Sequence, residues 1–127
     1  MLIIISHQQM RLLISGYRNF HDQAIIEEQM LEILKDVPGP HTIIHGKCNG
    51  VDLAAEKIAL KHKWKIEPYP YIKSLGLRGG PIRNLQMIIE GKPDYALLFL
   101  SPSSKGTKNM LTLVERHNIS YTLVELS

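Results

Sequence analysis

Short apolar segments alternate along the chain with longer stretches of helical periodicity. The apolar segments run over residues 12–14, 42–44, 65–69, 95–100 and 119–124. Between the first two, apolar residues recur at helical spacing, at Ile26, Met30, Ile33, Leu34 and Val37. Repeated strand–helix alternation predicts a mostly parallel sheet with helices on both faces, because crossover connections are right-handed. We therefore expect a Rossmann-like three-layer α/β sandwich with a sheet of about five strands.

Several helix boundaries carry their own signals. Asp22 precedes the first helix and Asp52 precedes a second helix over 53–62, so both side chains are placed to cap helix N-termini. Pro38-Gly39-Pro40 ends the first helix. Thr107 is placed to cap a last helix, whose apolar residues are Met110, Leu111 and Val114.

A short helix is expected to start with Pro81 at its first position, with Gly91 just past its end. Its apolar residues are predicted to share one face: Ile82, Leu85 and Ile89. Residues 71–80 lack periodicity and carry two cations and three glycines, which predicts a loop over a site. The continuous apolar run that follows, Tyr95–Leu100, is typical of a central strand.

The length and composition fit one domain. With 127 residues, 44% of them apolar, the chain can bury a single core, which we assign to residues 11–127. Residues 1–10 are expected to form an N-terminal extension or an edge strand. The single cysteine, Cys48, forms no internal disulfide, and no secretory leader is visible, so we expect a cytoplasmic protein. No apolar run approaches the roughly 20 residues that span a bilayer, so no membrane partner is expected.

Three predicted strands run directly into turns rich in glycine and small polar residues. The turns are Ser15–Arg18, Gly46–Asp52 and Ser101–Thr107. In an open α/β sheet such turns gather at the carboxyl ends of the strands, where ligands bind. Glycine lets the backbone approach a ligand closely, and the following helix start offers free N–H groups. The glycines concerned are Gly16, Gly46, Gly50 and Gly106. These features predict a phosphate-binding site.

The charge distribution supports an anionic ligand. The net charge is only +3. The candidate site loops (15–20, 46–52, 71–84 and 101–109) nevertheless hold seven cations and a single acid, Asp52. The cations are Arg18, Lys47, Lys73, Arg78, Arg83, Lys105 and Lys108. Because a solvated surface usually mixes both signs, this imbalance favours an anion in the loops.

The sequence lacks the signatures of several common sites. It contains neither a G-x-G-x-x-G dinucleotide fingerprint nor a P-loop. His41 and His45 would stand about 13 Å apart on a strand, and no cysteine pair completes a zinc site, so we expect no metal and no cofactor. No triad signature surrounds the loop serines, which suit phosphate or turn hydrogen bonds better than nucleophilic attack.

A few residues remain as carriers of chemistry. Arg83 presents a planar donor fork suited to a phosphate. Other residues, Ile82, Leu85 and Ile89, already form the apolar face of its predicted helix, so Arg83 is available to contact an anion. Asp52 is the one acid of the loops, so Arg83 and Asp52 are the catalytic candidates if the chain is an enzyme. Three tyrosines offer stacking surfaces for a base: Tyr17, Tyr69 and Tyr71.

Four ordered motifs carry a family resemblance over residues 11 to about 124. They are Ser15–Phe20, His45–Asp52 followed by Leu53-Ala54-Ala55, Gly80–Asn84 with Met87, and Gly106–Met110. With them the chain resembles the SLOG superfamily of Rossmann-like proteins, most closely its YspA-type, cpYpsA-related branch. The resemblance implies binding of a nucleotide or nucleotide-derived ligand, and self-association. It also implies kinship with the LOG phosphoribohydrolases and with the DNA-processing protein DprA.

Our leading hypothesis is a sensor or sequestering protein that binds a phosphorylated nucleotide. The phosphate would lie on Gly106, Thr107 and the preceding serines, with Arg83 and Arg18 as charge partners and Tyr17 over the base. The full set of expected ligand-binding residues is Ser15, Gly16, Tyr17, Arg18, His45, Gly46, Lys47, Gly50, Asp52, Arg83, Asn84, Ser101, Ser103, Ser104, Gly106, Thr107 and Asn109.

Two alternatives stay open. The first is a LOG-like hydrolase that cleaves an N-glycosidic bond, with a water oriented by Asp52 or by another residue. Asn109 and Met110 stand where the acidic motif of the LOG enzymes would fall, and cleavage through an oxocarbenium-like state requires a carboxylate. The second is DprA-like binding of single-stranded DNA, for which the chain offers eight aromatic residues and no long basic stripe.

Overall fold

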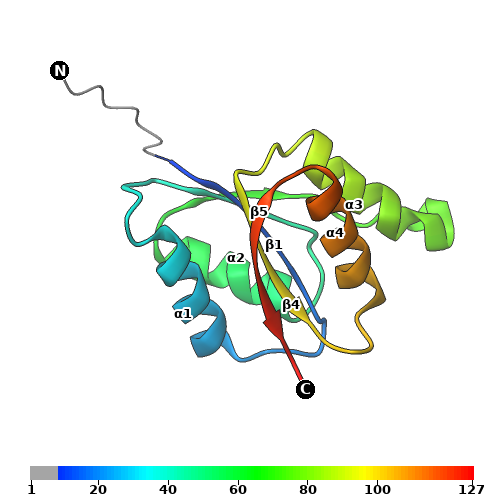
Figure 1. The fold of residues 1–127 in the computed structure, drawn as a ribbon, viewed down its shortest axis with the longest axis horizontal. Helices are drawn as coiled ribbons and strands as arrows, with labels where there is room; N and C mark the ends of the chain where they lie inside the picture. The colour runs from blue at the N-terminus through cyan, green and yellow to red at the C-terminus, as the bar shows by residue number, and fades with distance from the viewer. Residues whose placement is uncertain (1–8) are drawn as a thin grey trace.

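The computed structural model describes residues 9–127, which form one sheet flanked by helices (Figure 1). The strands are β1 (Arg11–Gly16), β2 (Thr42–His45), β3 (Lys65–Pro68), β4 (Tyr95–Leu100) and β5 (Ser120–Glu125). The helices are α1 (Gln23–Leu34), α2 (Val51–Lys61), the 3-10 helix η1 (Lys73–Arg78), α3 (Gly79–Ile89) and α4 (Lys105–Arg116). All strand pairs are parallel, in the order β3-β2-β1-β4-β5. The predicted Rossmann-like α/β fold is confirmed.

The side chains of alternate strand residues pack into two separate hydrophobic cores, one on each face of the sheet. On β1, Leu12 and Ile14 pack with α1 and α2, whereas Leu13, between them, packs with α3 and α4. β4 divides in the same way, with Leu97 and Phe99 on the first face. Because successive side chains of a strand point to opposite faces, a continuous apolar run fills both cores. The helices accordingly cover both faces of the sheet (Figure 1).

The strand order places a topological switch at the centre of the sheet. From β1 the chain runs outward to β2 and β3, then returns to place β4 on the other side of β1. The register Leu12↔Tyr95 to Gly16↔Phe99 aligns the carboxyl ends of β1 and β4. The connections leaving these two ends diverge to opposite faces of the sheet, which opens a crevice between them.

Two of the predicted helix signals hold. Asp22 is the N-cap of α1, and its Oδ1 accepts a hydrogen bond from the Ile25 backbone N at 3.1 Å. Gly91 follows the C-cap residue of α3, Glu90, as expected.

Three predicted helix starts are wrong. α2 begins at Val51 after the N-cap Gly50, so Asp52 lies inside the first turn and bonds to the preceding loop instead. α4 begins at Lys105 after the N-cap Ser104, which places Thr107 within its first turn. α3 begins at Gly79, two residues before Pro81, because η1 leads directly into it.

Ile82, Leu85 and Ile89 share one face of α3, as expected, but that face is exposed rather than buried. Ile82, Leu85 and Ile89 are 45%, 42% and 54% exposed. The buried face carries Arg83, Asn84, Met87 and Ile88 instead. The polar pair is buried because α3 packs against α4 beside the crevice, where Arg83 and Asn84 find hydrogen-bond partners.

The segment 71–80, expected to be a loop over the site, contains η1, and none of its side chains lines the crevice described below. The expected N-terminal extension or edge strand lies mostly at residues 1–8, outside the described residues. Met10 leads directly into β1, and its backbone N donates to His41 Nδ1 at 3.0 Å. Within 9–127, no helix combines the length and the apolar character needed to cross a membrane.

Candidate functional site

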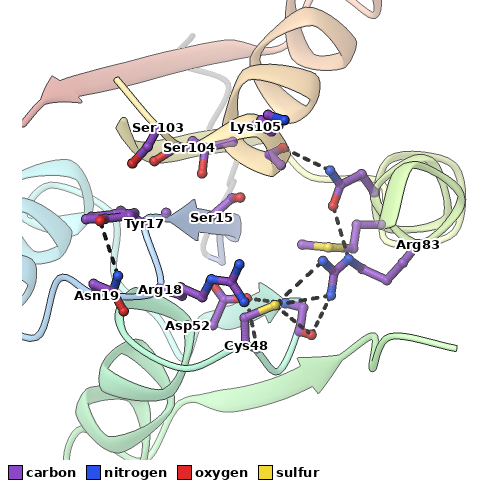
Figure 2. A pocket seen from close by; sticks show the side chains of 16 residues that line it. Ser15, Tyr17, Arg18, Asn19, Cys48, Asp52, Arg83, Ser103, Ser104 and Lys105 are labelled. Carbon is purple, nitrogen blue, oxygen red and sulfur yellow. Dashed lines mark hydrogen bonds between the residues drawn. The ribbon is translucent and has the colours of Figure 1, made fainter. Parts of the chain in front are cut away.

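A cleft of about 530 Å³ opens at the carboxyl ends of β1, β2 and β4, at the switch point of the sheet (Figure 2). Four chain segments line it: the turns after these three strands and the inner face of α3. The lining residues are Ser15, Gly16, Tyr17, Arg18, Asn19, Gly46, Cys48, Asp52, Arg83, Asn84, Met87, Ser103, Ser104, Lys105, Gly106 and Thr107. The cleft therefore lies where open α/β sheets bind ligands.

The N-terminus of α4 forms one wall of the cleft. The turn before it is held by its own serines, since Ser104 Oγ accepts from the Ser101 backbone N at 3.0 Å. The N-cap side chain makes no capping bond to the helix. Among the described residues, the backbone N–H groups of Gly106 and Thr107 have no hydrogen-bond partner. Free N–H groups at a helix start, with the partial positive charge of the helix dipole, attract an anion.

Four glycines were expected to let the backbone approach a ligand closely, and Gly106 is the one of them at which an added side chain would meet open space. A Cβ at Gly106 would meet nothing within 4 Å. At Gly46 it would lie 2.4 Å from Arg83 Nη1, and at Gly16 it would lie 2.6 Å from Val51 Cγ2. At Gly50 it would lie 2.4 Å from the Arg18 carbonyl oxygen. At the other three positions glycine is therefore needed to avoid a collision with neighbouring protein atoms rather than to admit a ligand.

Arg83 reaches across the cleft from α3 to the turn after β2. Its Nη1 donates to the Gly46 carbonyl at 2.6 Å and its Nε donates to Asn84 Oδ1 at 3.0 Å. Both terminal nitrogens lie 3.6 Å from Cys48 Sγ. These contacts hold the guanidinium in one orientation, with the residue only 8% exposed. A fixed, buried cation at the cleft wall attracts anionic groups strongly because water screens it little.

Asn84 connects the two helices that flank the cleft. Its Nδ2 donates to the Gly106 carbonyl at 3.1 Å and to Asn109 Oδ1 at 2.9 Å. The same side chain receives the Arg83 Nε bond. Arg83 and the start of α4 are thereby held in a fixed relation to each other.

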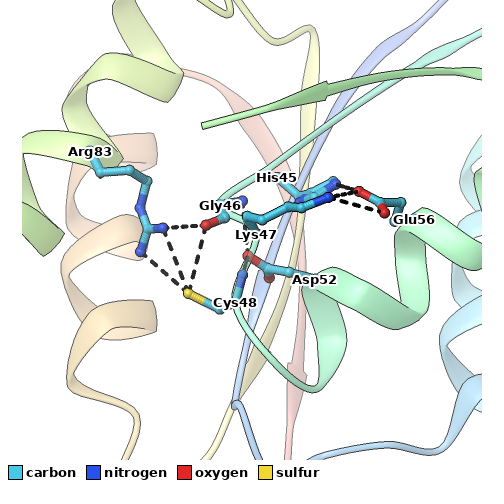
Figure 3. A network of polar contacts seen from close by, with 7 residues as sticks. All are labelled: His45, Gly46, Lys47, Cys48, Asp52, Glu56 and Arg83. Carbon is cyan, nitrogen blue, oxygen red and sulfur yellow. Dashed lines mark hydrogen bonds and ion pairs between the residues drawn. The ribbon is translucent and has the colours of Figure 1, made fainter. Parts of the chain in front are cut away.

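Asp52 holds the turn after β2 from inside the first turn of α2 (Figure 3). Its Oδ2 accepts from the backbone N of Gly46 at 2.9 Å and from that of Cys48 at 3.4 Å. Burial raises the pKa of Asp52 to about 7, against the opposing effects of these two hydrogen bonds and of the Arg83 charge. It is the one acid among the cleft-lining residues that the structure describes.

A second polar group lies behind this turn and faces away from the cleft (Figure 3). His45 is fully buried; its Nδ1 accepts from the Lys47 backbone N at 2.9 Å, and its Nε2 lies 3.0 Å from Glu56 Oε1. Because Nδ1 accepts, the ring proton belongs on Nε2, which donates to Glu56. Burial lowers the pKa of His45, and the Lys47 hydrogen bond lowers the pKa of Glu56. His45, Lys47 and Glu56 therefore support the turn.

Tyr17 lines the cleft on the side away from Arg83 (Figure 2). Its hydroxyl accepts from Asn19 Nδ2 at 3.2 Å, and this bond, with one to Ser103, lowers the pKa of the phenol. The other two tyrosines predicted to stack lie elsewhere. Tyr69 donates its hydroxyl to Glu67 Oε2 at 2.6 Å, and Tyr71 donates to the Gly76 carbonyl near η1.

Most of the residues expected to bind ligand share the cleft, and five do not line it. These five are His45, Lys47, Gly50, Ser101 and Asn109. The lining also includes four residues absent from that expectation: Asn19, Cys48, Met87 and Lys105. Met87 lies one helical turn after Arg83 and Asn84, so helical spacing from Arg83 could have found it. Asn19, Cys48 and Lys105 lie within the predicted site loops.

The structure also sorts the seven loop cations. Arg18, Arg83 and Lys105 line the cleft. Lys47 pairs with Glu56 at 3.0 Å, and Lys108 Nζ donates to the Pro102 carbonyl at 2.8 Å. The remaining two, Lys73 and Arg78, belong to η1. The cleft keeps a positive excess, with three cations and one acid of raised pKa. Nowhere in residues 9–127 do three or more histidine, cysteine or carboxylate side chains gather as metal ligands.

Comparison with known proteins gives one match. Residues 10–71, from the residue before β1 to just past β3, match the sequence model of the YspA, cpYpsA-related SLOG family. That segment contains the turns after β1 and β2, and so one half of the cleft. No curated protein and no solved structure matches the chain.

Proposed function

Because the chain belongs to the YspA, cpYpsA-related SLOG family, which indicates nucleotide-related ligand binding in general, we propose that the cleft binds a phosphorylated nucleotide. The chain acts by holding this ligand, as a sensor or a sequestering protein. The observation that carries the proposal is the pair of free N–H groups at Gly106 and Thr107, which face a cleft lined by three cations.

The phosphate lies at the start of α4. The Gly106 and Thr107 N–H groups donate to its oxygens, with the Ser103 hydroxyl and the Lys105 ammonium beside them. Arg83 completes the charge from the opposite wall. Hydrogen bonds between charged partners contribute about 1.5–3 kcal/mol each, so the loss of one of them should weaken binding at least about tenfold.

The base lies on the side of the cleft away from Arg83, over the Tyr17 ring. Stacking of a base on an aromatic side chain contributes about 1–3 kcal/mol and depends little on the identity of the base. Asn19, which donates to the Tyr17 hydroxyl, helps to orient the ring for this contact.

A glycine substitution separates ligand binding from folding. Gly106→Ala places a methyl group in open space at the α4 wall and is expected to keep or slightly raise stability, because alanine favours a helix over glycine by up to about 1 kcal/mol. The same methyl group fills the position of the phosphate. We expect calorimetric affinity for the best-bound nucleoside monophosphate to fall at least tenfold.

The matched control is Gly80→Ala on α3. Gly80 is also helical, its added Cβ meets only Tyr71 Cε2 at 4.0 Å, and it does not line the cleft. Its variant should bind nucleotide as the parent does. If the Gly106→Ala protein and the parent bind every tested nucleotide with equal affinity, the phosphate does not bind at the start of α4.

Asp52 favours a second candidate, a nucleotide hydrolase that cleaves the N-glycosidic bond. A carboxyl group with a pKa near 7 at the cleft lining is suited to general acid–base work on a bound sugar or water. Incubation with purine and pyrimidine nucleoside monophosphates should then release free base, and Asp52→Asn should abolish the release. If none of these nucleotides releases free base, the hydrolase candidate is excluded and only the binding function remains.

A further inference from the structure

A smaller groove of about 330 Å³ adjoins the cleft on the α2 side. We call it the side groove. It runs between the segment after β1 and one face of α2, and its lining residues are Arg18, Asn19, His21, Gln23, Asn49, Gly50, Leu53, Ala54 and Lys57. Gly50 and Ala54 are small and buried, so they leave room above the helix surface.

The charges of the side groove have one sign. The cations Arg18 and Lys57 line it together with the imidazole of His21, and none of its described lining residues is acidic. The acids nearest in sequence are engaged elsewhere. Asp22 caps α1 through the Ile25 backbone N, and Glu56 pairs with His45 and Lys47 behind the turn after β2. A groove lined by two cations and by no acid attracts an anion.

The side groove and the cleft share a wall. Arg18 and Asn19, in the segment after β1, line both spaces. That segment rests on Gly50, which has a φ of +77° and leaves no space for a Cβ beneath the Arg18 carbonyl. The Arg18 guanidinium is therefore within reach of a ligand in either space.

We propose that the side groove is a second phosphate subsite, and that the ligand is a dinucleotide-type molecule whose two phosphate groups occupy the cleft and the groove. This proposal rests on the proposed function. The first phosphate lies at the start of α4, the intervening nucleoside passes Arg18 and Asn19, and the second phosphate contacts Lys57 and His21. The side groove supplies two donors for the second phosphate that lie outside the cleft, Lys57 and His21.

The test compares matched ligands by calorimetry. The probes are the four 5′-ribonucleoside monophosphates and the four corresponding 5′-phosphorylated homodinucleotides. In at least one matched pair the dinucleotide should bind about tenfold more tightly, the gain from one additional charge-assisted hydrogen bond. Lys57→Gln should remove this gain and leave the affinity for the mononucleotide unchanged.

Lys61→Gln is the matched control, since Lys61 lies one turn further along α2, outside the side groove, in an exposed pair with Glu27. It should affect neither ligand. The proposal is overturned if no dinucleotide binds more tightly than its mononucleotide, or if Lys57→Gln weakens both ligands equally. Failure of every mononucleotide and dinucleotide to bind would instead remove the proposed function as well. If a ten-nucleotide single strand gains a further tenfold that Lys57→Gln abolishes, the occupant is a nucleic acid strand and the dinucleotide assignment falls.

Discussion

At the scale of single residues, Asp52 combines structural and electrostatic roles. Its Oδ2 accepts two backbone N–H groups and so shapes the turn after β2, while burial raises the pKa of the carboxyl to about 7. The same residue contributes the one acid to the lining of a cationic cleft. Its protonation therefore couples the turn, the charge of the cleft and the stability of the fold.

The raised pKa of Asp52 predicts a specific pH dependence of stability. Between about pH 4 and pH 7 the folded state holds a proton that the unfolded chain releases, so this contribution to stability is lost as pH rises through that window. The free energy of unfolding of the parent, relative to Asp52→Asn, should fall by up to roughly 1.4 kcal/mol per pH unit across it. Urea unfolding at half-unit pH steps measures both curves.

Comparing the two proteins removes the other titrating groups. Burial lowers the pKa of His41 and of His45, which contributes stability that is lost as pH falls, equally in parent and variant. Parallel curves for the two proteins would contradict the raised pKa. Should the variant fail to fold, NMR titration of the Asp52 carboxyl carbon in the parent reports the same pKa directly.

At the scale of elements, the ends of β1 and β2 both require glycine, for different reasons. A Cβ at Gly16 would press on Val51 Cβ at 2.8 Å and Phe99 Cβ at 2.9 Å, atoms held by α2 and β4. A Cβ at Gly46 would press on Arg83 Nη1, the end of a long side chain that can be displaced only by breaking its hydrogen bond to Gly46. The first contact belongs to the core, and the second belongs to the site.

Alanine at these two positions should therefore act differently. Gly16→Ala is expected to destabilise the fold by about 1–3 kcal/mol, the cost of overpacking a core. Gly46→Ala should cost less than Gly16→Ala but displace Arg83 and reduce nucleotide affinity at least tenfold. Chemical denaturation and calorimetry on both variants separate the effects. A Gly46→Ala protein that binds as the parent does would show that Arg83 makes no contact with the ligand.

The order and type of the strands and α-helices could be read from the sequence, because apolar periodicity and the placement of glycine and proline determine them. The 3-10 helix η1 and three of the four α-helix starts could not. Asp52 has the side chain of an N-cap, but its two hydrogen bonds go to Gly46 and Cys48, contacts that exist only once the turn has folded. The burial of Arg83 could not be predicted either, because the partners that its guanidinium contacts, Gly46 and Tyr69, are distant in the sequence. Tertiary partners decided both positions.

The cleft could be located in outline for a related reason. Strand ends of a parallel sheet meet at one edge, so the turns after β1, β2 and β4 were expected to converge. Which residues within each turn face the ligand depends on side-chain direction. His45 ends β2 beside Gly46, yet it points behind the turn toward Glu56, and Lys47 follows it there. Sequence proximity to a glycine does not determine that direction.

At the scale of the whole molecule, the outer face of α3 carries an exposed apolar stripe formed by Ile82, Leu85 and Ile89, and the exposed Leu77 lies just before this helix, in η1. Leu77 is 96% exposed. Arg78 lies at one end of the stripe and Glu90 at the other, and both are exposed. Two such helices packed antiparallel about a twofold axis would cover both stripes and bring Arg78 of each copy toward Glu90 of the other. The self-association expected from the sequence therefore has a candidate surface.

Self-association through the stripe remains a prediction with a direct test. Leu85→Glu places a charge at its centre and should shift the protein to monomers, because burying an unpaired carboxylate opposes association. Leu60→Glu, at a residue on α2 that is 62% exposed, is the control and should leave the mass unchanged. Sedimentation velocity from 5 to roughly 200 μM, a range around the weak interfaces that small patches support, measures both variants and the parent. A parent that stays monomeric throughout, or a Leu85→Glu protein that associates as the parent does, would show that the stripe is not an interface between copies of the chain.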